Sequence, residues 1–149
     1  MNYVLDTNIL LFYLRDARTK AHVEQLYGPF SSGNNPIISI VTVGEIRALA
    51  RKNQWGGKRL QAVKSLMEKL IVVDVKYEPI LDQYAEIDAF SQGTLLEKPL
   101  GMSARNMGKN DLWIAATSVV TESALITSDG DFDHLHRKFF DVFKVERVI

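Results

Sequence analysis

Residues 3–8 read Tyr-Val-Leu-Asp-Thr-Asn, a short apolar run that ends on an acid. Residues 124–129 read Ala-Leu-Ile-Thr-Ser-Asp, a second apolar run with an acid just beyond it. Parallel α/β sheets bind ligands outside the carboxyl ends of their strands. The two stretches therefore predict an α/β fold that carries acidic groups at one edge of its sheet.

Short β-like runs alternate with longer runs of helical periodicity along the whole chain. We expect strands at residues 3–5, 37–40, 71–73, 124–127 and 142–148, and helices at 9–15, 20–27, 43–52, 60–70, 79–90 and 111–121. This alternation indicates right-handed crossovers and a mainly parallel sheet that is covered on both faces. Residues 93–109, with Pro99, Gly101 and Gly108, read as a long irregular segment.

Composition excludes several classes of protein. The 149 residues fit one domain, spanning 1–149. Cysteine is absent, which rules out disulfides, a cysteine nucleophile and thiolate metal sites. The first residues do not form a signal peptide and no apolar run could span a membrane, so we expect a cytoplasmic protein. Lys plus Arg equals Asp plus Glu at 18 each, which counts against a strong nonspecific nucleic-acid binder.

Four acids stand out by their positions. Asp6 and Asp129 follow strands, while Glu45 and Asp111 fall in the first turns of expected helices. Any one of them alone could be a turn residue, a helix cap or a solvated side chain. Together they belong to the same edge of the sheet, although they come from four distant parts of the chain.

A group of like charges opposes folding unless something compensates for the repulsion. Mg²⁺ and Mn²⁺ are bound in proteins by carboxylates and water, and these cations would remove the cost. The three histidines, His22, His134 and His136, do not fall with the acids, so zinc is a poorer fit. Carboxylate-held Mg²⁺ is best suited to phosphoryl transfer.

Four motifs, in this order and spacing, resemble the PIN domain and, within it, the VapC-type toxins of bacterial toxin–antitoxin pairs. The motifs are Leu5-Asp6-Thr7-Asn8, the helix of Glu45, the run Asn110–Ala116 and the run Thr127–Phe132. The resemblance extends from Asn2 to about Leu135.

The resemblance implies a three-layer α/β/α sandwich and Mg²⁺- or Mn²⁺-dependent endonucleolytic cleavage of RNA. It also implies a homodimer and a cognate antitoxin that blocks the site. Asp6, Glu45, Asp111 and Asp129 would be the catalytic, metal-binding acids. Thr7, Asn8 and Thr127 would orient carboxylates by hydrogen bonds. Two features depart from the small toxin pattern: the segment 93–108 is long, and Asp131 competes with Asp129 as the fourth ligand.

Several other side chains are weaker candidates. Basic residues that could bind RNA phosphates are Arg47, Arg51, Lys52, Arg105 and Lys109. Trp55, beside Gly56, is expected to be the better exposed of the two tryptophans and could stack on a base, whereas Trp113 is expected in the core. Asp88 is expected on a solvated helix face.

Two alternative functions remain open at this stage. One is a catalytically silent PIN-fold module that binds RNA or protein, although self-repelling acids serve no purpose in a pure binder. The other is an aspartate phosphoacceptor of the receiver type, which also collects acids at strand ends around Mg²⁺. The sequence shows no convincing Thr/Ser and Lys arrangement for that chemistry.

Overall fold

The computed structural model describes all residues, 1–149. Its centre is a sheet of five strands, all parallel, in the order β3-β2-β1-β4-β5. The strands are β1 (Asn2–Leu5), β2 (Asn35–Ser39), β3 (Ile71–Val73), β4 (Ala124–Thr127) and β5 (Val142–Lys144). The predicted parallel α/β fold is confirmed.

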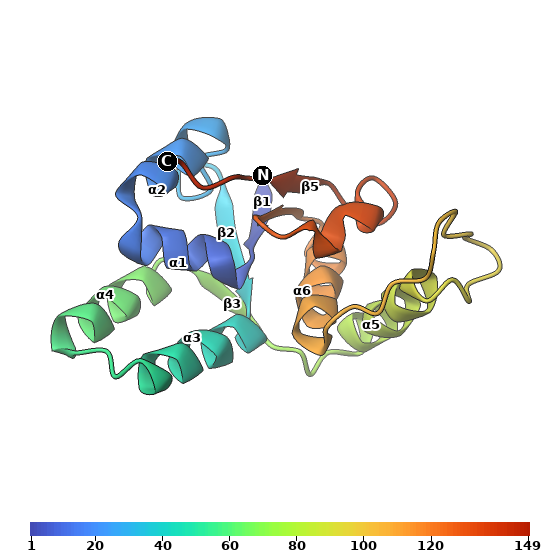
Figure 1. The fold of residues 1–149 in the computed structure, drawn as a ribbon, viewed down its shortest axis with the longest axis horizontal. Coiled ribbons are helices and arrows are strands. Elements are labelled where there is room, and N and C mark those ends of the chain that lie inside the picture. Colours follow the sequence, from blue (N-terminus) through green and yellow to red (C-terminus); the bar gives the residue numbers. More distant parts are fainter.

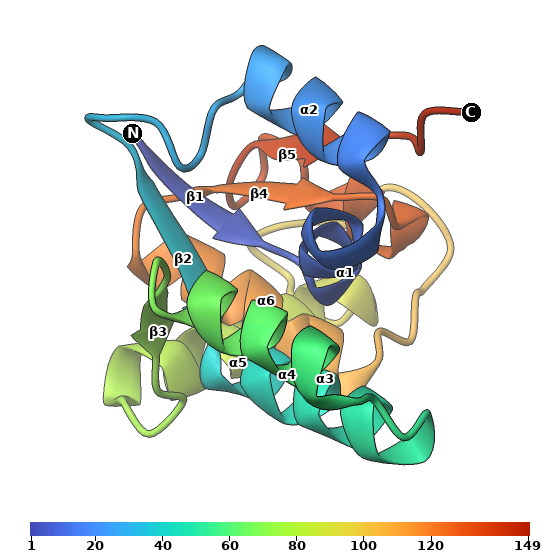
Figure 2. The same cartoon turned by 90° about the vertical axis from the view of Figure 1, so that its left-hand side faces the viewer.

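Helices cover both faces of this sheet, which makes the three-layer sandwich (Figures 1 and 2). On one side lie α1 (Thr7–Arg15), α2 (Ala17–Leu26), α3 (Ile40–Lys52) and α4 (Gly57–Met67). On the other side lie α5 (Glu78–Ser91) and α6 (Lys109–Val120), and a 3₁₀ helix, η1 (Gly130–Leu135), packs beside α6 and β5. No helix combines the length and the apolar composition needed to cross a membrane.

Two apolar cores lie on the two faces of the sheet, because successive strand residues point in opposite directions. In β1, Val4 belongs to the core beneath α5 and α6, whereas Tyr3 and Leu5 belong to the core beneath α1–α4. All three side chains are buried. A strand that is apolar at every position is therefore required, and this explains the uninterrupted apolar run at residues 3–5.

The strand order determines which strand ends lie next to one another at the carboxyl edge of the sheet. The central strand β1 has β2 and β4 as its neighbours, so the exits of these three strands lie side by side. Receiver-type proteins have the order 2-1-3-4-5, and this sheet does not. The order therefore disfavours the phosphoacceptor alternative.

Some element boundaries differ from the sequence predictions. Helix α1 begins at Thr7 and α3 at Ile40, because Asp6 and Ser39 cap them by accepting hydrogen bonds from the Thr7 and Val41 backbone N–H groups. The strand predicted to run to residue 148 ends at Lys144. The 3₁₀ helix η1 was not predicted from the sequence.

The expected exposure of Trp55 is wrong. The chain turns after α3 through Gln54, which has a φ of 52°, and the Trp55 backbone N–H donates to the Ala50 carbonyl oxygen at 3.0 Å. This turn directs the indole ring into the core beneath α1–α4, where it is only 9% exposed. Trp113 is half-buried and packs against Tyr84, with ring centroids 4.2 Å apart.

Candidate active site

A cavity of about 420 Å³ opens at the carboxyl edge of the sheet, between α1, α3 and the start of α6. Asp6, Glu45, Asp111 and Asp129 all line it. Asp6 comes from the β1–α1 junction, Glu45 from α3, Asp111 from the first turn of α6 and Asp129 from the end of the β4–η1 turn. The fold thus brings the four acids selected from the sequence into one cavity.

Asp6 lies deepest in this cavity, with 4% of its surface exposed. One carboxylate oxygen accepts a hydrogen bond from the Thr7 backbone N–H at 2.8 Å, and the other accepts from the Thr127 hydroxyl at 2.7 Å. Burial raises the pKa of Asp6 to about 6; the two hydrogen bonds oppose this shift, and the charges of Glu45 and Asp129 add to it. Asp6 is therefore both the cap of α1 and a carboxyl group whose ionisation is costly.

Threonine hydroxyls hold two of the acids in place. The Thr7 hydroxyl donates to a Glu45 carboxylate oxygen at 2.7 Å. The Thr42 hydroxyl oxygen lies 3.3 Å from the Thr7 hydroxyl oxygen. The Thr127 hydroxyl donates to Asp6 and accepts from the Asp129 backbone N–H at 3.0 Å. Both Thr7 and Thr127 are buried, and the hydrogen bond from Thr127 to Asp6 is shielded from water.

Two asparagines also line the cavity. Asn8 is exposed and makes no side-chain hydrogen bond to any acid, so the structure gives it no orienting role. Asn110 was not singled out from the sequence, although it directly precedes Asp111. Its place in the first turn of α6 was the available clue.

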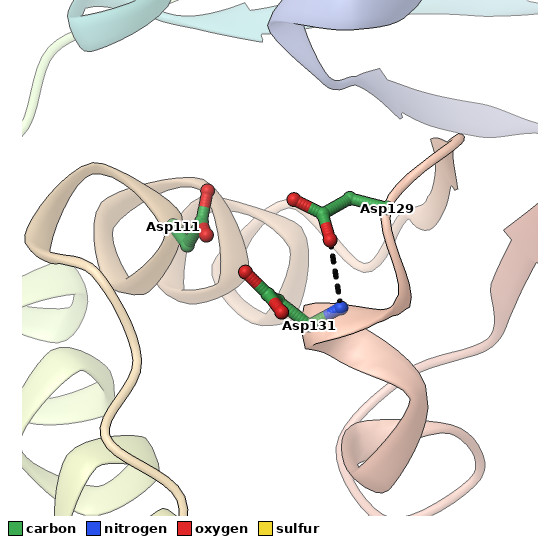
Figure 3. Close-up of side chains that lie close together, drawn as sticks. All are labelled: Asp111, Asp129 and Asp131. Atoms are coloured by element: carbon green, nitrogen blue, oxygen red, sulfur yellow. Dashed lines mark hydrogen bonds between the residues drawn. The ribbon is translucent and has the colours of Figure 1, made fainter.

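A closer group of three carboxylates forms where α6 meets η1. One oxygen from each of Asp111, Asp129 and Asp131 lies within 4.8 Å of the others (Figure 3). The Asp131 backbone N–H donates to Asp129 at 2.9 Å, which fixes the turn that carries both acids. Burial raises the pKa of Asp111 to about 7, and the charges of Asp6, Asp129, Asp131 and Glu45 raise it further.

This donor set fits a divalent cation. It consists of carboxylate oxygens, which are the preferred ligands of Mg²⁺ and Mn²⁺. Burial, and then repulsion by the neighbouring acids, raises the pKa values of Asp6 and Asp111, and no salt bridge of the protein neutralises either carboxylate. A bound cation would supply that neutralisation and, in addition, activated water. Asp111 and Asp129 belong to both the cavity lining and the three-carboxylate group, and so they are the residues best placed to hold it.

A model of the PIN domain family matches residues 3–138 of the chain. The chain belongs to the PIN domain family. No curated protein matches it at a significant level.

Solved structures share the fold of this PIN domain over nearly its whole length. VapBC-1 from nontypeable Haemophilus influenzae has 26% identity and a TM-score of 0.70, covering 97% of this chain and 98% of that one. VapBC2 from Rickettsia felis, bound to a promoter DNA fragment, has 17% identity and a TM-score of 0.73, covering 98% and 100%. A toxin–antitoxin complex from Klebsiella pneumoniae has 18% identity and a TM-score of 0.64, covering 87% and 89%.

The basic residues proposed from the sequence are not gathered at the acids of this PIN domain. Arg47 and Arg51 lie on the other face of α3 from Glu45 and line a separate cavity beside Trp55. Arg105 and Lys109 are exposed, and neither lines the acidic cavity. The one cation that does line it is Lys52, at the end of α3.

The long segment 92–108 of the PIN domain is anchored at its base, although it extends beyond α5 (Figure 1). The Arg105 backbone N–H donates to the Ser91 carbonyl oxygen at 2.7 Å, and the Ser91 hydroxyl lies 2.8 Å from His134 Nε2. Met107 is buried and fills core volume beside Ser91. Burial lowers the pKa of His134, and the charge of Arg105 adds to this shift; the imidazole is engaged here rather than with the acids.

Proposed function

We propose that this PIN domain protein is a Mg²⁺- or Mn²⁺-dependent endoribonuclease that hydrolyses RNA phosphodiester bonds. The observation that carries the proposal is the convergence of Asp6, Glu45, Asp111 and Asp129 in one cavity. A binding module has no need of carboxyl groups whose pKa values are raised by burial and mutual repulsion. A cation-dependent phosphodiester hydrolase needs such a group to hold its cation.

In this proposal the acids bind the cation and the threonines orient the acids. Asp111 and Asp129 would hold the cation, with Asp6 behind them, because their carboxylates converge on the cavity from different elements. Thr127 and Thr7 would keep Asp6 and Glu45 in fixed orientations. Preorganised carboxylates lower the reorganisation needed when the substrate binds. Asp131 is exposed, and its carboxylate would add negative charge beside Asp129 on the solvent side of the cation.

Cleavage of a labelled RNA, with a DNA of the same sequence as control, tests this function. We expect RNA to be cut with Mg²⁺ or Mn²⁺ and to remain intact with chelator, and we expect DNA to be spared. RNA bound but left intact in the presence of either cation would refute the nuclease and favour the catalytically silent RNA-binding module.

We further propose that the protein is the toxin of a type II toxin–antitoxin pair and acts in the cytoplasm. Support comes from the likeness to the VapBC structures and to the Klebsiella toxin–antitoxin complex. The neighbouring gene is the decisive observation, and it should encode a small DNA-binding protein. Co-purification of that protein with this chain, and inhibition of cleavage by it, would establish the pair.

We also propose a homodimer, formed at the β3 edge of the sheet. β3 is an edge strand that pairs only with β2, and exposed apolar side chains occur on β3, directly after β2 and in the β3–α5 segment and the first turns of α5. They are Ile40, Ile71, Val72, Tyr77 and Leu81. Exposed apolar groups beside an unpaired strand edge are typical of surfaces that bind another protein. A second copy of the chain offers the same surface and can satisfy it symmetrically.

A further inference from the structure

A second cavity, of about 590 Å³, lies where the α3–α4 turn meets the end of α1. It is lined by Leu14 of α1 and by residues 53–59 and Ala62. Lys58 and Arg59 stand at its wall, and no acidic side chain lines it. The charged side chains of this cavity are therefore cationic, whereas those of the acidic cavity are mainly carboxylates.

The two cavities follow the same faces of the same helices. On α1, Thr7 and Leu11 line the acidic cavity and Leu14 lines the second one. These positions are separated by four and three residues, so they form one stripe about 10 Å long. Glu45 and Lys52 of α3 line the acidic cavity, and Asn53, which directly follows α3, lines the second. The two cavities are thus neighbours along α1 and at the end of α3.

Lys58 and Arg59, the two cations of the second cavity, are free to bind an anion. The salt bridges of the protein are Lys144–Asp133 and Arg147–Asp16, and neither involves a residue that lines either cavity. The Arg59 guanidinium lies over the Trp55 ring, 5.3 Å from its centroid. This stacking holds Arg59 at the cavity wall, and a guanidinium presents several N–H donors that match a phosphate.

We infer that this groove, from the acids along α1 and α3 to Lys58 and Arg59, binds the RNA backbone beyond the phosphodiester that is cut. The inference rests on the proposed nuclease function, because that function places one phosphate at the acids. Lys52 then lies between the two sites, and Lys58 and Arg59 bind phosphates further along the strand. Trp55 supports Arg59 and does not stack on a base, since its ring is buried.

An acidic segment of a partner protein is the competing occupant. The groove favours RNA because one continuous ligand must meet carboxylates at one end and cations at the other. RNA does so when its scissile phosphate is held through a cation, whereas an acidic peptide is repelled by the acids. A polyglutamate peptide serves as the probe for this alternative.

The test compares Lys58→Gln/Arg59→Gln with a matched control, Lys64→Gln/Lys76→Gln. All four side chains are exposed, and neither Lys64 nor Lys76 lines either cavity of the groove. Affinity for a fluorescent single-stranded RNA is measured by anisotropy in chelator, over a series of salt concentrations. Thermal melts verify that each variant is folded.

We expect the Lys58/Arg59 variant to bind the RNA about tenfold more weakly than the control variant. The slope of log affinity against log salt should fall in magnitude by about 1.4, since each of two phosphates left without its cation lowers it by about 0.7. In cleavage reactions KM should rise while kcat changes little. The control should match the unchanged protein in every measurement.

Equal affinities and salt slopes in the two variants would overturn the groove, and so would loss of polyglutamate binding with RNA binding intact. RNA cleavage tests the nuclease proposal separately from the RNA affinities. If RNA is cleaved but Lys58 and Arg59 do not matter, the groove fails and the function stands. If RNA is bound through Lys58 and Arg59 but never cleaved, the groove stands and the function fails.

Discussion

The Thr127 hydroxyl donates a hydrogen bond to the Asp6 carboxylate at 2.7 Å, joining the ends of β4 and β1. The Thr127 hydroxyl oxygen also accepts a hydrogen bond from the Asp129 backbone N–H, so one buried side chain orients two acids. The hydrogen bond also lowers the pKa of Asp6, against the larger effect of burial. Thr127 therefore controls both the position and the charge of the deepest acid.

Replacing this hydroxyl should weaken cation binding. Thr127→Val keeps the shape of the side chain but leaves an Asp6 oxygen without its donor. We expect the affinity for Mg²⁺ to fall by about 10- to 100-fold, as is typical when a group that orients a ligand is removed. Calorimetric titration with Mg²⁺ measures it. Thr127→Ser keeps the hydroxyl and is the control; equal losses of affinity in both variants would contradict this role of Thr127.

Asp111→Asn should abolish cleavage without unfolding the protein. The side chain is half-buried in a group of acids, so neutralising it relieves repulsion. In chelator the variant should melt no lower than the unchanged protein. Circular dichroism beside the RNA cleavage assay is the measurement, and full activity of the variant would remove Asp111 from the site.

Mg²⁺ should stabilise the unchanged protein more than Asp111→Asn. A ligand that binds only the folded state, at a hundredfold excess over Kd, contributes about 2.7 kcal/mol. For a domain of this size, that corresponds to a rise in Tm of very roughly 5–10 °C. The variant lacks one of the carboxylates proposed to hold the cation and should gain clearly less. Equal shifts of both proteins, or no shift of either, would mean that these acids do not form a cation site.

Without a cation, the acids should make the protein less stable as the pH rises. The pKa values of Asp6, about 6, and Asp111, about 7, lie above their ordinary value of 3.8, so the folded state binds more protons between these limits. Their contribution is fully present below about pH 4 and is lost as the pH rises through about 7. Burial of His134 lowers its pKa, which has the opposite effect in the same range.

A difference measurement separates these effects. Urea unfolding in chelator at pH 4.5 and 7.5 is compared between the unchanged protein and Asp6→Asn/Asp111→Asn, in which His134 still contributes. We expect the unchanged protein to lose about 1 kcal/mol or more relative to the variant; solvent screening of the half-exposed Asp111 makes this a modest figure. The same pH dependence in both proteins would exclude raised pKa values at Asp6 and Asp111.

Asp129 and Asp131 should differ in importance. Asp129 lines the cavity with the other three acids, whereas Asp131 is exposed and does not line it. We expect Asp129→Asn to reduce kcat by at least about a hundredfold and Asp131→Asn by about tenfold or less. Asparagine can still cap η1 at position 129, so both variants should fold. The reverse order of effects would assign the fourth ligand to Asp131.

A charge at the β3 edge should dissociate the proposed homodimer. Val72→Glu places a carboxylate on an exposed apolar strand without disturbing the buried core. Sedimentation equilibrium at micromolar concentration should show a dimer for the unchanged protein and a monomer for the variant. Lys64→Glu, on the exposed side of α4, is the control. A monomer in the unchanged protein, or a dimer in Val72→Glu, would contradict this interface.

The sequence alone determined the layers of this protein and predicted which acids would lie at one edge of its sheet. Apolar runs at β1 and β4 had to be buried on both faces, which requires a parallel sheet with helices on each side. In such a sheet the strand exits share one edge, so the sequence predicts that Asp6, Glu45, Asp111 and Asp129 lie close together, and all four do line one cavity. These inferences succeed because they depend on local periodicity and on a general rule of topology.

The tertiary structure decided which way individual side chains face. A helix begins where its cap forms; the sequence left a cap at Asp6 as one of several alternatives and did not reveal the cap at Ser39. Arg47 and Lys52 lie on the same helix, but only its packing against α1 shows that Lys52 faces the acids and Arg47 does not. Trp55 follows a sharp turn, and its burial depends on the apolar core to which α1, α3 and the sheet contribute.

Interactions between distant residues were beyond the sequence for the same reason. The Thr127–Asp6 hydrogen bond requires β4 to pair beside β1 in one register, with Leu5 opposite Ile126. The approach of Asp131 to Asp111 requires η1, a short helix without a strong periodic pattern. Local propensity fixes which elements form, whereas the packing of those elements, summed over many weak attractions, fixes the atoms that meet.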